Sequence, residues 1–254
     1  MSKYLFACKP LILFLFICLT CFSCARRDGS NYEVQDAEIN SAGHTIEYYD
    51  SVALKQLDDN LHNDKLDYLN FGFYSKEVVP ERVFSKIDIK RLTIFHTNLR
   101  KLPKSICRLT SIKDLNLSHN RLSDIDEITC LINLEFLFLD QNRLEILPDT
   151  FSNLSKLYHL DISQNKFNSK DINKLPMNLV ELHIANSNFS EVPKAVFDLK
   201  QLEFLNLSNN NLSELPTELV ELKNLKRILI YGNPINVSQL NEFRKVMTWC
   251  DIEF

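Results

Sequence analysis

A single frame of apolar residues recurs along most of the chain, and it restricts the possible folds more than any other feature. The clearest copy occupies residues 133–151 and reads NLEFLFLDQNRLEILPDTF. Its frame is Leu-x-x-Leu-x-Leu-x-x-Asn-x-Leu, followed by a Leu-Pro pair and a phenylalanine. Eight units fit this frame at steps of 22 or 23 residues, and they begin at Leu66, Ile89, Ile112, Leu134, Leu157, Leu179, Leu202 and Leu225. A period of this length predicts a solenoid over residues 66–236, in which each unit stacks on the next.

The two leucines of each Leu-x-Leu segment are expected to point in the same direction, because side chains alternate between the two faces of a strand. Leu137 and Leu139 therefore enter the core, whereas residues 136, 138 and 140 face outward. Neighbouring units place these segments side by side, which predicts one parallel sheet along the array.

An asparagine follows most of the predicted strands, at the point where the chain turns toward the core. Backbone groups that lose their strand partners at such a turn need new ones, and a buried amide side chain both donates and accepts. Thr97 and Ser187 take this position in two units and can supply part of the same function. Tyr74 cannot, so the first unit is expected to be the least regular. The asparagines are Asn120, Asn142, Asn165, Asn210 and Asn233.

The repeated frame and its Leu-Pro pair resemble the leucine-rich repeat family over residues 66 to about 249. This resemblance implies an α/β repeat fold, a right-handed, horseshoe-shaped solenoid with a parallel sheet on its concave side. It also implies a protein that binds other macromolecules through that face. We therefore expect a non-enzymatic, monomeric module without a cofactor, whose partner is a protein or peptide.

The first 23 residues have the layout of an export signal. Lys3 and Lys9 give a basic start, and residues 11–22 form an apolar run. This run is shorter than the roughly 20 apolar residues that cross a membrane as a helix, which favours a cleaved signal peptide. Residues 24–46 are polar and are expected to form a flexible tether.

The end of the apolar run, Cys21-Phe22-Ser23-Cys24, resembles the lipoprotein box of bacteria. In that family the cysteine after the small residue becomes the lipidated first residue of the mature protein, which implies lipidation of Cys24. Cys21 remains the alternative, and it also stands where the family favours leucine. Together with the repeats, this start resembles a bacterial leucine-rich repeat lipoprotein, exported and anchored to a membrane in the periplasm or at the cell surface.

Both ends of the array need a cap, because a terminal repeat otherwise exposes its apolar flank. Residues 47–65 predict an N-terminal cap helix that begins after Asp50-Ser51. Residues 237–254 predict a C-terminal cap made of a helix, capped by Ser238, and a final strand. Trp249 is expected to be buried there. The predicted helix carries one apolar face formed by Leu240, Phe243, Val246 and Met247.

The sequence limits the chemistry of the chain in two ways. A formal net charge of -4 does not provide the basic surface that binds phosphate backbones, which argues against nucleic acid. Only 4 glycines are present, and no phosphate-binding glycine motif occurs. Cys107 and Cys130 lie one repeat apart on the convex side, where a disulfide is possible, but we expect small buried thiols.

The outward positions of the strands form two rows along the concave face, beginning at Tyr68 and Asn70, with a third row beyond them. Phe136, Phe138 and Phe204 have no core to enter from this side, so they are expected to be exposed and to act as binding hot spots. The predicted partner-binding residues are Phe95, Phe136, Phe138, His159, Asp161, Glu181, His183, Phe204, Arg227 and Tyr231.

Four of these residues form a block, in which His159 should lie beside Glu181 and Asp161 beside His183. Adjacent carboxylates favour charged histidines, so the block is expected to change its charge in the physiological pH range. The same residues offer two imidazoles and two carboxylates to a metal ion, which leaves a metal-dependent activity as a less favoured alternative.

The leading hypothesis is therefore a lipid-anchored binding protein outside the cytoplasm. A second interpretation with the same fold is a structural envelope protein, or an adhesin that binds glycan. The sequence does not decide between these partners.

Overall fold

The computed structural model describes residues 55, 67–72, 77–85 and 88–254. The chain divides into two compact units, residues 1–48 and 49–254, and every described residue belongs to the second unit. The predicted signal peptide, tether and lipidated Cys24 lie outside the described residues, as do Tyr74 and almost all of the predicted N-terminal helix. No helix among the residues that the structure describes is long and apolar enough to cross a membrane.

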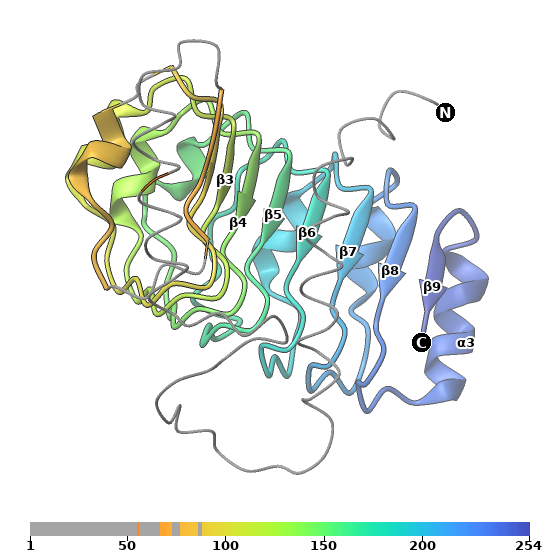
Figure 1. The fold of residues 1–254 in the computed structure, drawn as a ribbon. Coiled ribbons are helices and arrows are strands. Elements are labelled where there is room, and N and C mark those ends of the chain that lie inside the picture. The colour runs from red at the N-terminus through yellow and green to blue at the C-terminus, as the bar shows by residue number, and fades with distance from the viewer. Residues whose placement is uncertain (1–54, 56–66, 73–76, 86–87) are drawn as a thin grey trace, which may run out of the picture. The chain divides into compact units, whose positions relative to one another are not determined.

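The described part of the chain forms one parallel sheet, whose strands follow one another in chain order (Figure 1). Each strand spans three residues and pairs with the strands before and after it. The nine strands are β1 (Tyr68–Asn70), β2 (Arg91–Thr93), β3 (Asp114–Asn116), β4 (Phe136–Phe138), β5 (His159–Asp161), β6 (Glu181–His183), β7 (Phe204–Asn206), β8 (Arg227–Leu229) and β9 (Asp251–Glu253). This arrangement confirms the predicted leucine-rich repeat solenoid.

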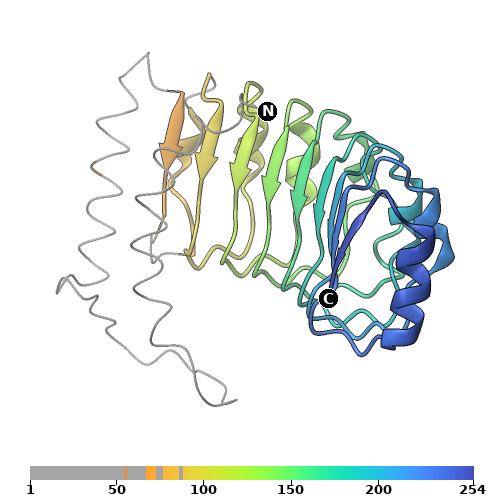
Figure 2. The ribbon, with the colours of Figure 1, turned by 90° about the vertical axis from the view of Figure 1, so that its right-hand side faces the viewer.

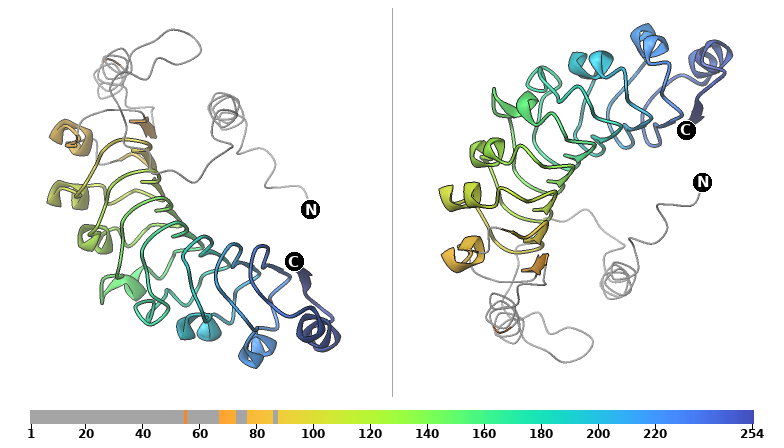
Figure 3. Two further views of the ribbon diagram at one scale, coloured as in Figure 1. Left: turned by 90° about the horizontal axis from the view of Figure 1, so that it is seen from below. Right: turned by 90° about the horizontal axis from the view of Figure 1, so that it is seen from above.

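Short 3-10 helices occupy the returning side of most turns, and Figure 3 shows them on the outer side of the arc that the described repeats form. Pro103 precedes one of them, and its carbonyl accepts the first i to i+3 hydrogen bond, from the Ile106 amide at 3.0 Å. The helices are η1 (Glu81–Ser85), η2 (Lys104–Arg108), η3 (Asp126–Cys130), η4 (Phe151–Asn153), η5 (Lys194–Asp198) and η6 (Thr217–Glu221).

The core follows the predicted alternation. The middle residue of every strand is buried, and its two neighbours are at least partly accessible. The strand register aligns Leu115, Leu137 and Leu160 across β3, β4 and β5, and all three are fully buried. Leu139 is fully buried as well. One continuous apolar core therefore runs under the sheet.

The asparagines form a hydrogen-bonded ladder between successive turns, as predicted. The Asn142 amide nitrogen donates to the Leu117 carbonyl at 2.9 Å and to the Leu139 carbonyl at 3.0 Å, and its oxygen accepts from the Leu122 amide at 3.0 Å. Asn165 repeats this pattern one turn later. Each side chain thus satisfies backbone groups of its own turn and of the turn before it.

Threonine and serine at the same position do part of this work. The Thr97 hydroxyl donates to the Asn120 side-chain oxygen at 2.5 Å and accepts from the Leu99 amide at 3.2 Å. The Ser187 hydroxyl donates to the Ala185 carbonyl at 3.1 Å.

The residue before each of these positions adopts a left-handed backbone, which was not predicted. The φ angles lie between 51° and 68° and belong to His96, His119, Gln141, Gln164, Asn186, Asn209 and Gly232. Histidine and asparagine tolerate this region better than most residues. The frame leaves this position undefined, so its conformation was not evident in the sequence.

Cys107 and Cys130 form a disulfide between η2 and η3, so the expectation of free thiols was wrong. Positions one repeat apart lie on adjacent turns, and the Cα–Cα distance of 5.5 Å suits a disulfide. Cys130 is also exposed rather than buried in the core. Cys250 is a free thiol, and burial, together with Asp251, raises its pKa to about 11.

Helix α3 (Val237–Val246) and strand β9 follow the last repeat (Figure 2). Asn236 caps the helix, because its side chain accepts a hydrogen bond from the Ser238 amide at 2.8 Å, so the prediction of Ser238 as the cap was wrong. Val246 is 56% exposed and does not join the apolar face of the helix. Trp249, predicted to be buried, is 38% exposed and lies under the Lys223 ammonium group at 4.2 Å.

Candidate functional site

The strand register produces the predicted rows on the concave face. In the first row, Phe136 aligns with His159, which aligns with Glu181. In the second row, Phe138 aligns with Asp161, which aligns with His183. Because adjacent strands lie about 4.8 Å apart, aligned side chains are direct neighbours.

Aromatic rings make a continuous band across strands β4 to β7. The His159 ring lies between the rings of Phe138 and His183, with centroid distances of 4.7 and 5.0 Å. The His183 ring also contacts Phe204 at 5.0 Å, and Phe136 lies 6.2 Å from His159. We call Phe136, Phe138, His159, His183 and Phe204 the aromatic band.

The phenylalanines of the aromatic band are half-buried, so the prediction that they are exposed was too simple. Rings on adjacent strands lie in contact, so each ring covers part of the surface of the next one. The Tyr158 ring, 5.8 Å from Phe136, adds to this cover. Tyr158 was not predicted, since it lies just before strand β5.

His159 and Glu181 form the predicted pair at the centre of the face. His159 Nδ1 lies 2.8 Å from Glu181 Oε2. The His159 side chain is only 12% exposed, and its other ring nitrogen, Nε2, is buried without a hydrogen-bond partner. The hydrogen bond from His159 is the main cause that lowers the pKa of Glu181, so this carboxylate is ionised at neutral pH.

Asp161 aligns with His183, but its carboxylate turns to its own strand end. One of its oxygens accepts a hydrogen bond from the Ser163 amide at 2.9 Å. Burial raises the pKa of Asp161, and the bonds from Ser163 and the charge of His159 act in the opposite direction.

His183 does not behave as predicted. Burial is the main cause that lowers its pKa, nearby His159 acts in the same direction, and the opposing charge of Glu181 is too small to compensate. The resulting pKa is about 4. His183 is therefore neutral at physiological pH, and the expected change in its charge there was wrong.

A second group of rings lies nearer to the N-terminal end of the sheet. The Phe95 ring contacts the His119 ring edge-on at 4.8 Å, and the His96 ring lies 5.7 Å from His119. His119 Nε2 is 3.9 Å from Asp140 Oδ2, and burial lowers the pKa of His119. Asp140 also accepts a hydrogen bond from the Ser118 hydroxyl.

Arg227 and Tyr231 lie at the other end of the sheet, away from the centre of the aromatic band. Both contact Glu253 on β9, which accepts hydrogen bonds from the Arg227 guanidinium and the Tyr231 hydroxyl. These bonds lower the pKa of Glu253, with the one from Tyr231 having the larger effect. Arg227 also aligns with Phe204, which connects this end to the aromatic band.

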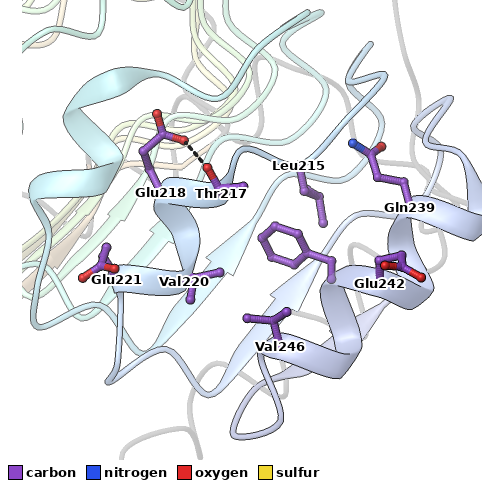
Figure 4. Close-up of a pocket in the computed structure, with 9 residues that line it drawn as sticks. Leu215, Thr217, Glu218, Val220, Glu221, Gln239, Glu242 and Val246 are labelled. Carbon is purple, nitrogen blue, oxygen red and sulfur yellow. Dashed lines mark hydrogen bonds between the residues drawn. The ribbon is translucent and has the colours of Figure 1, made fainter.

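An open groove lies between η6 and α3, outside the predicted concave surface (Figure 4). Its floor is apolar, and three glutamates, Glu218, Glu221 and Glu242, stand at its rim. Nothing in its lining combines groups that suit catalysis or metal binding, so the concave face remains the candidate site.

Comparisons with known proteins agree with this architecture. Two family models described as leucine rich repeat match residues 177–235 and 133–154. Human lumican is 31% identical over 182 residues, which cover 68% of this chain and 48% of lumican. Rabbit (Oryctolagus cuniculus) lumican is 32% identical over 136 residues, which cover 51% of this chain and 67% of that protein. The chain thus spans about half the length of human lumican.

Solved structures give the same result. A leucine-rich repeat protein of Leptospira interrogans has a TM-score of 0.62 at 28% identity, over 78% of this chain and 57% of that one. The ectodomain of the Arabidopsis thaliana receptor kinase GASSHO1/SCHENGEN3, in complex with CASPARIAN STRIP INTEGRITY FACTOR 2, has a TM-score of 0.52 at 26% identity. This match covers 62% of this chain and 20% of that chain. An internalin of Listeria monocytogenes shares the fold with a TM-score of 0.63 at 21% identity. This match covers 76% of this chain and 56% of the internalin.

The low pKa of His183 predicts a pH-dependent stability. Between the ordinary value of 6.5 and the folded value of about 4, the unfolded chain binds more protons than the folded one. The free energy of unfolding is therefore lost as the pH falls through this window. In urea titrations with a chelator present, we expect His183→Asn to lose roughly 3 kcal/mol less than the wild type between pH 7 and pH 4. Phe136→Leu, which removes a ring of the aromatic band that contacts Tyr158 and His159 rather than His183, should keep the wild-type pH dependence. An unchanged dependence in His183→Asn would contradict the assignment.

Proposed function

Because this chain belongs to the leucine-rich repeat family, we propose that it binds a protein or peptide through the centre of its concave face. The proposal includes a position outside the cytoplasm, with a lipid on Cys24 as the anchor. Binding, rather than catalysis, is the proposed activity.

The aromatic band is the observation that carries this proposal. Large aromatic side chains dominate the energetics of protein interfaces, because they bury much apolar area with few torsions to fix. Nothing in the repeat frame requires phenylalanine at positions 136, 138 and 204, since the core is built by the leucines between them. An apolar surface of this kind on a sheet is typical of an interaction site.

The mutual packing of the rings also supports the proposal. Phe138, His159, His183 and Phe204 hold one another at centroid distances of 4.7 to 5.0 Å. A side chain that is already held in place loses little entropy when a partner binds, so a larger share of the contact energy contributes to affinity. The half-burial of these rings is thus compatible with a pre-organised binding surface.

Polar groups surround the aromatic band and suit an interface rim. Glu181 lies beside it, and Arg227 aligns with Phe204 at its C-terminal side. Rim charges of opposite sign help to orient a partner, while the apolar centre provides affinity. A partner with an apolar segment flanked by charged groups fits this pattern.

The disulfide supports the proposed position of the protein. Disulfides persist in oxidising compartments outside the cytoplasm and are rare inside it. The Cys107–Cys130 bond lies in the repeats, far in sequence from the signal-like first 23 residues, so the two features support export independently. A lipid on Cys24 would keep the exported domain at a membrane surface.

Affinity capture followed by quantitative mass spectrometry tests the binding surface. We expect partners retained by the wild type to be depleted at least about tenfold with Phe138→Ala/Phe204→Ala, because hot-spot truncations cost about 1.4 kcal/mol or more. Ile146→Ala is the matched control, since Ile146 is 63% exposed but lies outside the sheet. If the double variant retains the same proteins in the same amounts, the concave face is not the binding surface.

Cell fractionation tests the anchor. When the full chain is expressed in a bacterium that exports it, we expect the wild type and Cys21→Ser in the membrane fraction and Cys24→Ser in the soluble exported fraction. Mass analysis of the N-terminal peptide of the mature protein should show a lipid on residue 24. Membrane retention of Cys24→Ser, or an unmodified residue 24, would exclude this anchor.

A further inference from the structure

Two adjacent strands bring three potential metal ligands together at the centre of the concave face. His159 comes from β5, and Glu181 and His183 come from β6, where alternation places both on the same side. One donor atom from each residue lies within 4.8 Å of the others. The register that aligns His159 with Glu181 therefore assembles the group without any contribution from a loop.

The spacing of these atoms is close to what a metal ion requires. Donors bound to one tetrahedral zinc ion at 2.0–2.1 Å lie about 3.3 Å from one another. His159 Nδ1 and Glu181 Oε2 are 2.8 Å apart, so a small separation of the two side chains would admit an ion. The side chain of Glu181 is partly exposed and free to make this adjustment.

The surroundings of His159 add a second observation. Its Nε2 atom is buried and has no hydrogen-bond partner, whereas a typical buried polar atom has at least one. The hydrogen bond to Glu181 places the imidazole proton on Nδ1, so an ion that binds between Nδ1 and the carboxylate takes the place of this proton. The ring itself is held in place between Phe138 and His183, so its donor atoms have defined positions.

His183 also has the properties of a ligand. Its ring packs between the rings of His159 and Phe204, with centroid distances of 5.0 Å to each, so its donor atoms are held in defined positions. Glu181 adds a carboxylate oxygen to the two imidazoles, and this oxygen already reaches His159 across the strand pair.

We propose that His159, Glu181 and His183 bind one divalent transition-metal ion, with Zn²⁺ as the expected occupant. Two imidazoles and one carboxylate form a zinc-type donor set, whereas Ca²⁺ and Mg²⁺ select oxygen ligands. Three protein ligands leave one coordination position open. That position lies on the accessible side of the sheet, so a group of a bound partner can occupy it.

Two neighbouring sites, Asp161 and the His119–Asp140 pair, offer similar donor groups, but the structure does not include them in the three-ligand group. Asp161 was expected to be a fourth ligand, but its carboxylate accepts the hydrogen bond from the Ser163 amide. His119 pairs with Asp140 at 3.9 Å, and these residues do not form a three-donor group within the described part of the chain. Both sites therefore provide matched controls.

Zinc titration of the untagged, metal-free full chain by calorimetry tests the site. We expect one ion per chain whose dissociation constant rises at least about tenfold in His183→Asn and in Glu181→Gln, because each variant removes a ligand. Asp161→Asn and His119→Asn should bind like the wild type, and Ca²⁺ and Mg²⁺ should not compete. Cysteines also bind zinc, but the N-terminal cysteines are the same in all variants. Only the ion whose binding weakens in the ligand variants is therefore assigned to this site.

Cobalt substitution gives a second readout that does not depend on affinity. Co²⁺ in a four-coordinate site with nitrogen and oxygen ligands has a visible absorption band that the hydrated ion lacks, and this band should disappear in His183→Asn and in Glu181→Gln. Circular dichroism should show the wild-type fold in both variants. If a folded ligand variant retains the wild-type zinc affinity and cobalt band, or if the wild type shows neither, the site does not exist.

Discussion

The repeated burial of leucines at alternate strand positions is the constraint on which the whole structure depends. Each strand has only three residues, so a single fully buried side chain, such as Leu137, fixes which face of its strand enters the core. The asparagine ladder then ties each turn to the one before it, through bonds such as those from Asn142 to two carbonyls. Because every repeat uses the same solution, the register of the sheet is set along its whole length.

This constraint also leaves the outward positions free to vary. The residues on either side of a buried leucine contribute little to the core, so the repeat frame does not dictate their identities. At the centre of the sheet these positions hold aromatic rings, two histidines and Glu181 in mutual contact. The proposed binding surface and the proposed metal site both use this one region, in which a partner would meet apolar rings and an ion together.

The rows of the concave face could be predicted from the sequence because they depend only on the period of two along a strand and on the repeat length. Features that depend on the exact geometry of the turns or on the burial of a side chain could not. The disulfide between Cys107 and Cys130 required knowing that equivalent positions on adjacent turns are 5.5 Å apart. The neutral state of His183 required its burial, because the nearby Glu181 alone suggested the opposite. The cap at Asn236, rather than Ser238, depended on local backbone angles that the pattern did not specify.

Adjacent residues of strand β4 have separate proposed roles, Leu137 in folding and Phe138 in binding. Equilibrium unfolding in urea of Leu137→Ala and Phe138→Ala compares the two roles at neighbouring positions. We expect Leu137→Ala to lower the free energy of unfolding by roughly 2–5 kcal/mol, as for other buried leucines. Phe138→Ala, whose ring lies outside the core, should cost about 1 kcal/mol. Equal losses for the two variants, or a larger loss for Phe138→Ala, would contradict the assignment of the two faces.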